Sequence, residues 1–427
     1  MKGRDCAAAG LPEELILFRQ PPDSLFAALC APTEEGIPSS AALRGLLDLA
    51  AERDWQGDLW HCFLALTLAL SENPFSLDRE RREGERDSLW RIALQDMERF
   101  RALFTLEWAG PIAAELRMFR RAADETVKVD PVTELAADLA AAPSAEAMLG
   151  SLCAWYRRHG VGMLGLGQLF RLREGALVSI DRRRDVRLDD LIGYEEQKRL
   201  LRENTEAFLA GRSANNVLLY GDAGTGKSTS IQALANEYGS QGLRIVELYK
   251  EQFDCIPALL TQIKRRNYRF LVLLDDLSFE ESEVGYKRLK AVMEGGGEAA
   301  PENVLFYATS NRRHLVREIW ADRSDMQHDG DIHRSDTMAE KLSLSGRFGL
   351  QIFYPDPSFE EYQTIVRRLA ERSGAPALPQ EELRALASAW QVRRGSRSGR
   401  TARQFVDDLS SRRAAETAGG NGDAGAG

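Results

Sequence analysis

Apolar residues in the first part of the chain recur every three or four positions, the spacing of one face of an α-helix. Such stripes run through residues 43–49, 60–70 and 89–104. Extra leucines widen the second stripe, which predicts a helix buried on most sides. We therefore expect an all-helical N-terminal domain over residues 1–175. Its pattern indicates a packed core without catalytic chemistry, serving as an adaptor surface or an oligomer scaffold.

Runs rich in apolar residues begin after this region and alternate with helical segments. They cover residues 176–180, 217–220, 243–248, 270–274, 303–309 and 351–354. The run at 270–274 is unbroken, as in a strand buried on both faces of a parallel sheet. The alternation predicts an α/β core over residues 176–355, with a parallel sheet between two layers of helices.

Helical periodicity returns near the C-terminus. Amphipathic helices are predicted over residues 358–373 and 379–389, and a third begins near Thr401. Together they would form a small helical domain over residues 356–413. The Ala/Gly-rich residues 414–427 cannot bury a core, so we expect a disordered tail.

Composition narrows the class of protein. The chain has 427 residues and a net charge of −9, which argues against coating nucleic acid nonspecifically but leaves open a local basic groove. Its five cysteines form no Cys-x-x-Cys pair, as in a reduced cytoplasmic protein. No apolar run approaches the roughly 20 residues that cross a bilayer, and no signal-peptide core is present. We expect a cytoplasmic protein that does not enter the membrane.

One stretch carries specific chemistry. The strand at residues 217–220 runs into Gly-x-x-x-x-Gly-Lys-Ser and then a helix, the pattern of a phosphate-binding P-loop. Its glycines bring backbone N–H groups toward an anion, and the helix N-terminus adds positive charge. Lys227 can reach the β- and γ-phosphates, and the Ser228 hydroxyl can bind Mg²⁺. The expected ATP-contacting residues are Gly221, Asp222, Ala223, Gly224, Thr225, Gly226, Lys227, Ser228 and Thr229.

Polar side chains end two later strands. Asp275 and Asp276 follow the strand at 270–274, and Asn311 follows the one at 303–309. Because open α/β sheets bind ligands at the carboxyl ends of their strands, these groups should face the P-loop. Asp275 is suited to hold Mg²⁺ through water, and Asn311 can donate to a phosphate or orient water without adding charge.

The order of these motifs resembles the AAA+ ATPases, and the resemblance implies further roles. Asp276 would polarise the attacking water. Ile192 and Gly193 would pack on the adenine ring. Arg347, in Arg-Phe-Gly, would act as an arginine finger on a neighbouring subunit's γ-phosphate, which implies a nucleotide-dependent homo-oligomer. The alternative is a structural arginine that pairs with a nearby acid. The helical C-terminal domain would be the AAA+ lid.

A lid arginine would also sense the phosphates from a helix start. Arg403 is favoured over Arg400 because it lies within the first turn. The strings NVLLYGDAGTGKS, FLVLLDDLSFE, NVLFYATSNRRHL, EKLSLSGRFGL and SGRTARQF are similar to the bacterial ATP-binding family known as domain of unknown function 815, a branch of the AAA+ class.

The motifs favour a Mg²⁺-dependent ATPase that remodels an unknown protein or nucleic-acid client. An alternative is a nucleotide-gated adaptor, resembling a helicase loader, with little or no turnover. An unfoldase would need an aromatic pore loop after the second strand, where Tyr249 stands. A tyrosine at a strand end is commonly a core residue, so this third interpretation is not favoured.

Overall fold

A computed structural model describes residues 11–21, 24–31, 33, 36–84, 86–120, 130–180, 186–277, 289, 291–293, 300–311, 345–373 and 378–419, with side chains except at 11–12 and 412–419. The chain forms two compact units, Met1–Gly167 and Gln168–Gly427, and each is described by itself. Within the described residues, no helix combines the length and apolar character that a membrane span requires.

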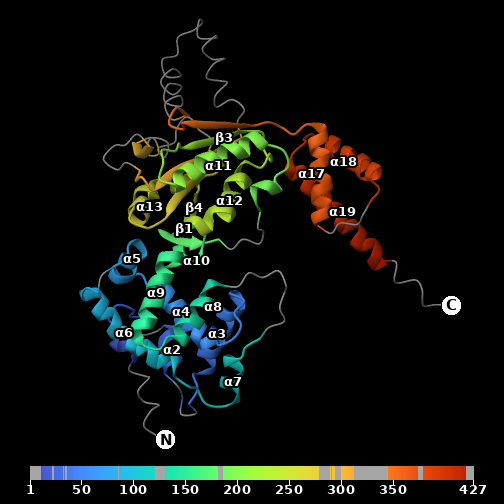
Figure 1. Ribbon diagram of the computed structural model, residues 1–427. Helices are drawn as coiled ribbons and strands as arrows, with labels where there is room; N and C mark the ends of the chain where they lie inside the picture. Colours follow the sequence, from blue (N-terminus) through green and yellow to red (C-terminus); the bar gives the residue numbers. More distant parts are fainter. Residues whose placement is uncertain are drawn as a thin grey trace, which may run out of the picture. The chain divides into compact units, whose positions relative to one another are not determined.

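The N-terminal unit is helical, as expected (Figure 1). Its helices are α1 (Leu11–Glu14), α2 (Leu25–Cys30), α3 (Ser40–Glu52), α4 (Leu59–Leu70), α5 (Pro74–Arg81), α6 (Ser88–Phe104), α7 (Pro111–Arg117), α8 (Pro131–Ala141), α9 (Ala145–His159) and α10 (Met163–Leu166). Polar N-caps set several starts: Ser39 and Asp58, for example, accept backbone N–H bonds in the first turns of α3 and α4. Nearly all of α4 is buried, which confirms the prediction from its widened apolar stripe.

The second unit contains a seven-stranded sheet of order β2-β1-β4-β5-β6-β3-β7. The strands are β1 (Leu169–Arg173), β2 (Ala176–Ser179), β3 (Val217–Gly221), β4 (Leu243–Leu248), β5 (Arg269–Leu274), β6 (Val304–Ser310) and β7 (Leu350–Tyr354). All neighbouring pairs are parallel except β1 and β2, which form an antiparallel hairpin. The expected α/β fold with a parallel sheet is confirmed.

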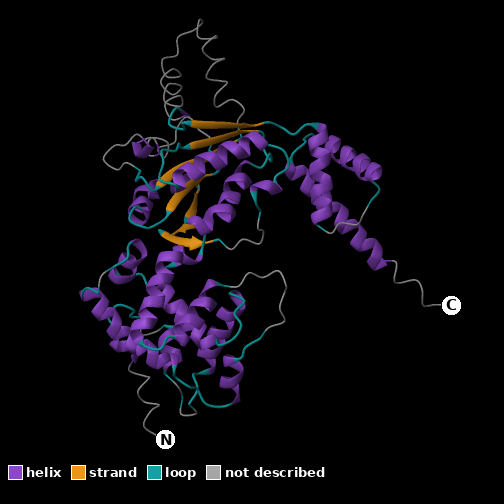
Figure 2. Ribbon diagram, viewed as in Figure 1, coloured by secondary structure: helices purple, strands orange, loops and turns teal. Residues whose placement is uncertain are grey.

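Helices pack over this sheet and share its hydrophobic core. Figure 2 shows α11 (Glu195–Leu209) and α12 (Lys227–Tyr238) over one face of the strands. Their apolar residues share a core with the strands, including Leu201, Phe208, Ile231 and Leu234. The short α13 (Ile256–Ile263) follows the 3₁₀ turn Lys250–Cys255, and the 3₁₀ turns Leu188–Asp190 and Gly239–Gln241 flank α11 and α12.

The expected boundary at residue 175 is wrong, because β1 precedes it and pairs with β4. Arginines interrupt the short apolar segment Leu169–Arg173, which lies within the residues expected to be helical. The arginine at its centre is accommodated because Arg171 donates to Glu247 of β4 at 2.8 Å. Glu247 lies far from Arg171 in the sequence, and its bond to Arg171 helps to hold β1 in the sheet.

The lid consists of α17 (Phe359–Arg372), α18 (Gln380–Arg394) and α19 (Gly399–Gly419). Tyr362, Val366, Phe405 and Val406 form the centre of its own small core. Helix α19 continues past the end expected at residue 413, since the alanines there favour helix without needing a core. The rest of the expected disordered tail, residues 420–427, lies outside the described residues.

Candidate nucleotide site

The turn between β3 and α12 requires glycine at two positions. Gly221 has φ +139°, and a Cβ there would lie 2.1 Å from the carbonyl oxygen of Tyr354. Gly226 has φ +96°, and a Cβ there would lie 2.7 Å from Leu191 Cδ2. A larger residue at Gly221 would collide with the backbone of β7, and at Gly226 it would be strained by the positive φ. The loop is therefore a backbone cradle, with its N–H groups and the start of α12 on one side.

Lys227 begins α12, and its side chain is buried at 4% exposure. Its ammonium donates to the carbonyl oxygens of Gly221 at 3.0 Å and Asp222 at 2.6 Å. Burial lowers the pKa of Lys227, and the negative charges of Asp222, Asp276 and Asp275 oppose that shift. Within the described part of the chain, no carboxylate forms an ion pair with this ammonium. A buried cation that only carbonyls contact is suited to an anionic ligand.

A hydrogen-bonded cluster lies across from the loop at the carboxyl ends of β5 and β6. Ser228 Oγ donates to Asp275 Oδ1 at 2.5 Å, and Thr309 Oγ1 donates to the same oxygen at 2.7 Å. The backbone N–H of Asp276 donates to Thr309 Oγ1 at 2.9 Å, and Asn311 Nδ2 donates to Asp276 Oδ1 at 2.7 Å. The structure thus brings together the two acids, the P-loop serine and the strand-end asparagine.

Asp276 adopts an unusual backbone conformation, with φ +53°. Non-glycine residues rarely occupy this left-handed region, and at ligand sites such strain commonly has a functional role. Here it turns the chain sharply after Asp275, so both carboxylates remain at the sheet edge. Both are exposed, as a group that binds metal or water must be.

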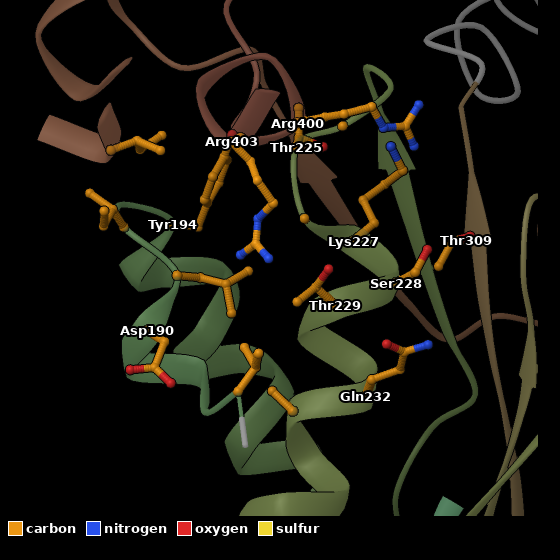
Figure 3. A pocket seen from close by; sticks show the side chains of 18 of the residues that line it. Asp190, Tyr194, Thr225, Lys227, Ser228, Thr229, Gln232, Thr309, Arg400 and Arg403 are labelled. Atoms are coloured by element: carbon orange, nitrogen blue, oxygen red, sulfur yellow. The ribbon is translucent and has the colours of Figure 1, made fainter. Parts of the chain in front are cut away.

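These groups line one cleft of about 1400 Å³ between the core and the lid (Figure 3). Apolar side chains cover one part of it: Leu191, Ile192, Tyr194, Ile365, Leu369 and Val406. The first three come from the segment before α11 and the others from the lid, so a flat apolar ring could be held between the two. The volume exceeds what a single nucleotide needs.

Most of the sequence-predicted residues line this cleft. They are Ile192, Gly224, Thr225, Gly226, Lys227, Ser228, Thr229, Asp275, Asp276, Asn311 and Arg403. Four others do not line it: Gly221 ends β3, and Gly193, Asp222 and Ala223 belong to the adjoining loops. Gly193 has φ +77°, which favours glycine at the turn into α11.

Both candidate lid arginines line the cleft. Figure 3 shows the guanidinium of Arg400 on the side of Lys227, whereas Arg403 points toward Thr229. Arg400 follows a loop that touches the P-loop: a Cβ on Gly224 would lie 2.8 Å from Ser398 Oγ and 3.1 Å from Arg400 Cβ. Arg400 therefore lies beside the P-loop, although the sequence favoured Arg403 for this role.

Arg347 lies elsewhere. It is exposed, does not line the cleft, and its carbonyl accepts from Asn216 Nδ2 at 3.4 Å. Asn216 precedes β3, whereas the P-loop follows that strand, so Arg347 is at the opposite edge of the sheet. Its position does not bring it to the site of its own chain.

Two cleft residues were missed from the sequence. Thr309 hydrogen-bonds to both Asp275 and Asp276. It stands two residues before Asn311, and residues at this spacing on a strand lie on the same face of the sheet, which could have indicated its place. Tyr194 has φ +60° and stacks on Tyr354 with ring centroids 5.0 Å apart. Its hydroxyl donates to the carbonyl of Pro355, at the junction with the lid. No local pattern marks that contact.

The core interpretation of Tyr249 is wrong. Its side chain is 44% exposed, and Arg171 lies over its ring at 5.6 Å from the centroid. Arg171 in turn binds Glu247, which also accepts from Gln232 Nε2 at 2.5 Å, one turn beyond Ser228 on α12. Tyr249 is thus an exposed residue after the carboxyl end of β4, and its ring packs against the guanidinium of Arg171.

The residues present fit a magnesium nucleotide. Groups of three or more His, Cys, Asp or Glu that could hold a metal are absent from the described residues. A single carboxylate and a hydroxyl, Asp275 and Ser228, match the way Mg²⁺ is held when phosphates complete its shell. The buried ammonium of Lys227 and the glycine cradle match the phosphates themselves.

This fold and site define an AAA+ type P-loop nucleotide-binding protein. Residues 168–413 match the family described as protein of unknown function (DUF815), and the chain belongs to that family.

Curated relatives are more distant. The Holliday junction branch migration complex subunit RuvB of Lawsonia intracellularis is 31% identical over 112 residues, covering 25% of this chain and 32% of that protein. The ATP-dependent zinc metalloprotease FtsH of Methylococcus capsulatus is 25% identical over 221 residues, covering 49% and 32%. The chain thus spans about a third of the length of these relatives. The Thermotoga maritima RuvB Holliday junction branch migration motor matches with 18% identity and a TM-score of 0.36, over 52% of this chain and 63% of that one.

Proposed function

We propose that the protein binds ATP with Mg²⁺ in this cleft and hydrolyses it to drive remodelling of a client. The observation that carries the proposal is the buried Lys227 ammonium, which among the described residues bonds only to carbonyls and faces two carboxylates that Thr309 and Asn311 hold. A triphosphate supplies the negative charge that Lys227 lacks, and the acids flank the place where its terminal phosphate would lie. The scattered free cysteines support a cytoplasmic location.

Each side chain has a separate task in this proposal. Lys227 and the loop amides bind the β- and γ-phosphates. Ser228 and Asp275 would hold Mg²⁺, which when bound neutralises charge on the phosphate oxygens. Asp276 accepts a proton from the attacking water at its carboxylate, and Asn311 orients that carboxylate. Ile192 and Gly193 receive the adenine, while Arg400 and Arg403 contact the phosphates from the lid.

We further propose that the active unit is a homo-oligomer formed in the presence of nucleotide. Arg347 is exposed at the sheet edge opposite the P-loop of its own chain. An arginine there can reach a phosphate only in a second copy. Its guanidinium would stabilise charge on the terminal phosphate, because it stays protonated and binds two oxygens at once.

One observation favours an alternative, a nucleotide-gated adaptor with little turnover. The carboxylate of Asp276 is bonded to Asn311 at 2.7 Å, so one of its oxygens is engaged by the amide instead of water. Its side chain is also shorter than glutamate, which restricts its reach. ATP turnover at saturating ATP, with and without DNA, separates the two functions.

The test compares two site variants with two matched controls. Lys227→Ala should abolish ATP binding, whereas Asp276→Asn should spare binding and remove turnover. The controls are the exposed Lys264→Ala and Asp48→Asn, which should leave both unchanged. Equal turnover by the wild type and Asp276→Asn would refute the role of that acid. Binding without turnover in the wild type would support the adaptor.

A further inference from the structure

The lid carries a stretch of unbalanced positive charge. Between residues 383 and 406 there is no Asp or Glu, in a chain whose net charge is −9. The basic residues of the stretch are all arginines: Arg384, Arg393, Arg394, Arg397, Arg400 and Arg403. Arg384 pairs with Glu360 at 2.7 Å. The other five form no ion pair with any residue that the structure describes, so their charge is available to a ligand.

These five arginines divide into two groups. Arg400 and Arg403 line the nucleotide cleft. Arg393, Arg394 and Arg397 are exposed and lie outside it, around the loop that joins α18 to α19. The nucleotide thus accounts for the first group only.

The exposed group is held in position by an aromatic ring. The guanidiniums of Arg393 and Arg394 lie 5.7 Å and 5.0 Å from the centroid of Trp390. Contact with the indole limits their freedom, which reduces the entropy lost when they bind a partner. Val392, beside them, is 76% exposed, an unusual place for a large apolar residue.

We propose that this lid arginine surface, made of Val392, Arg393, Arg394 and Arg397, binds the phosphate backbone of a nucleic acid. Guanidinium binds phosphate oxygens in pairs, and an exposed apolar side chain can contact sugar or base. An acidic peptide also carries negative charge. All the basic residues are arginines, two of them are held against the indole of Trp390, and an exposed valine lies beside them. These features favour a nucleic acid over an acidic peptide as the ligand.

The surface is connected to the nucleotide cleft, a consequence that rests on the proposed function. After Arg397 the chain passes through Ser398 into α19, which begins with Gly399 and Arg400. A Cβ on Gly399 would lie 3.4 Å from the carbonyl oxygen of Gly224 in the P-loop. Nucleic acid bound at Arg397 would therefore restrain the start of α19, which carries Arg400. We expect nucleic acid to change ATP turnover.

The test uses the full chain and a fluorescein-labelled oligonucleotide, single-stranded or duplex, followed by anisotropy over a range of salt. Arg393→Gln/Arg394→Gln should weaken binding about tenfold near physiological salt. The slope of log affinity against log salt should fall in magnitude by about 1.4 for single strands or about 1.8 for duplex. Arg397→Gln alone should lower the slope by about half as much.

A matched control is Arg157→Gln/Arg158→Gln. These exposed arginines lie in the last turn of α9, followed by His159 and Gly160, and Arg393 and Arg394 lie in the last turn of α18, followed by Gly395. Any effect of lost charge on a helix end is therefore similar in the two variants. The control should bind oligonucleotide like the wild type.

Three results would overturn the inference: no salt-dependent binding by the wild type, equal loss in both double variants, or displacement of the oligonucleotide by polyglutamate at equal charge, which would identify an acidic protein partner. ATP binding is measured on the same samples. Retained ATP binding without oligonucleotide binding overturns the surface alone, and the reverse result overturns the proposed function alone.

Discussion

Thr309→Val removes one hydroxyl and almost no volume from the centre of the acid cluster. Thr309 is 2% exposed, and its Oγ1 donates to Asp275 at 2.7 Å while accepting from the Asp276 N–H at 2.9 Å. Valine keeps the branched shape but can do neither. Asp275 would then lose a donor, and the strained turn at Asp276 would lose the acceptor of its own N–H.

The size of the effect follows from these two bonds. A hydrogen bond to an ionised carboxylate contributes about 1.5–3 kcal/mol, and an N–H left unpaired costs about 1–3 kcal/mol. Both carboxylates are exposed, so water replaces part of the loss. We expect a net cost of about 2 kcal/mol to the positioning of the acids, which corresponds to a decrease in turnover of about thirtyfold.

The assay is ATP turnover at saturating ATP and Mg²⁺, with ATP affinity measured in parallel. Affinity should change little, because Lys227 and the loop are untouched. Thr309→Ser keeps the hydroxyl and should restore most of the turnover. Thr67→Val, at a buried threonine of the N-terminal unit that donates to a helix carbonyl, is the matched control and should leave turnover unchanged. Wild-type turnover by Thr309→Val would refute the positioning role.

Three other predictions concern the loop, its lysine and the second copy. Gly221→Ala should destabilise the C-terminal unit by about 3 kcal/mol in chemical denaturation, because its Cβ would meet a β7 carbonyl at 2.1 Å; Gly242→Ala, with φ +91° and nothing within 4 Å, carries only the backbone strain and should cost less. ATP affinity should fall as the pH rises through the lowered pKa of Lys227, with onset below the ordinary 10.5, because the protonated form binds phosphate. Without ligand, the lowered pKa decreases the free energy of unfolding at neutral pH, and this loss of stability disappears as the pH rises toward 10.5. Calorimetric titration across the alkaline range checks the sign, and an onset at or above 10.5 would contradict it. Arg347→Ala should keep ATP binding and lose turnover, and mixing it with Lys227→Ala chains should restore part of the activity; no restoration in mixtures that co-elute on sizing would count against action between copies.

Much of the fold could be predicted from local pattern. A strand buried on both faces is mostly apolar, so the runs that became β3, β5 and β6 were visible without any contact information. The P-loop was equally visible, since its strand, turn and helix are consecutive. Strand β1 was missed because it contains Arg171, whose place in the sheet depends on an ion pair with Glu247 of another strand. Such a strand cannot be recognised from its own residues.

Prediction of the site from the sequence was limited by the same dependence on contacts between distant residues. Thr309 stands on a predicted strand, but its importance lies in bonds to Asp275 and the Asp276 N–H, more than thirty positions earlier. The choice between the two lid arginines depends on where Ser398 packs against Gly224, which the order of residues does not disclose. The roles of the predicted site residues remain predictions, and most of these residues line one cleft.

Calorimetric titration with ATP and Mg²⁺ tests the central claim most directly. We predict saturable binding at one site per chain for the wild type and its loss in Lys227→Ala, with Lys264→Ala binding like the wild type. No heat of binding for the wild type, or an unchanged isotherm for Lys227→Ala, would contradict the claim that the glycine cradle and its buried ammonium hold a nucleotide.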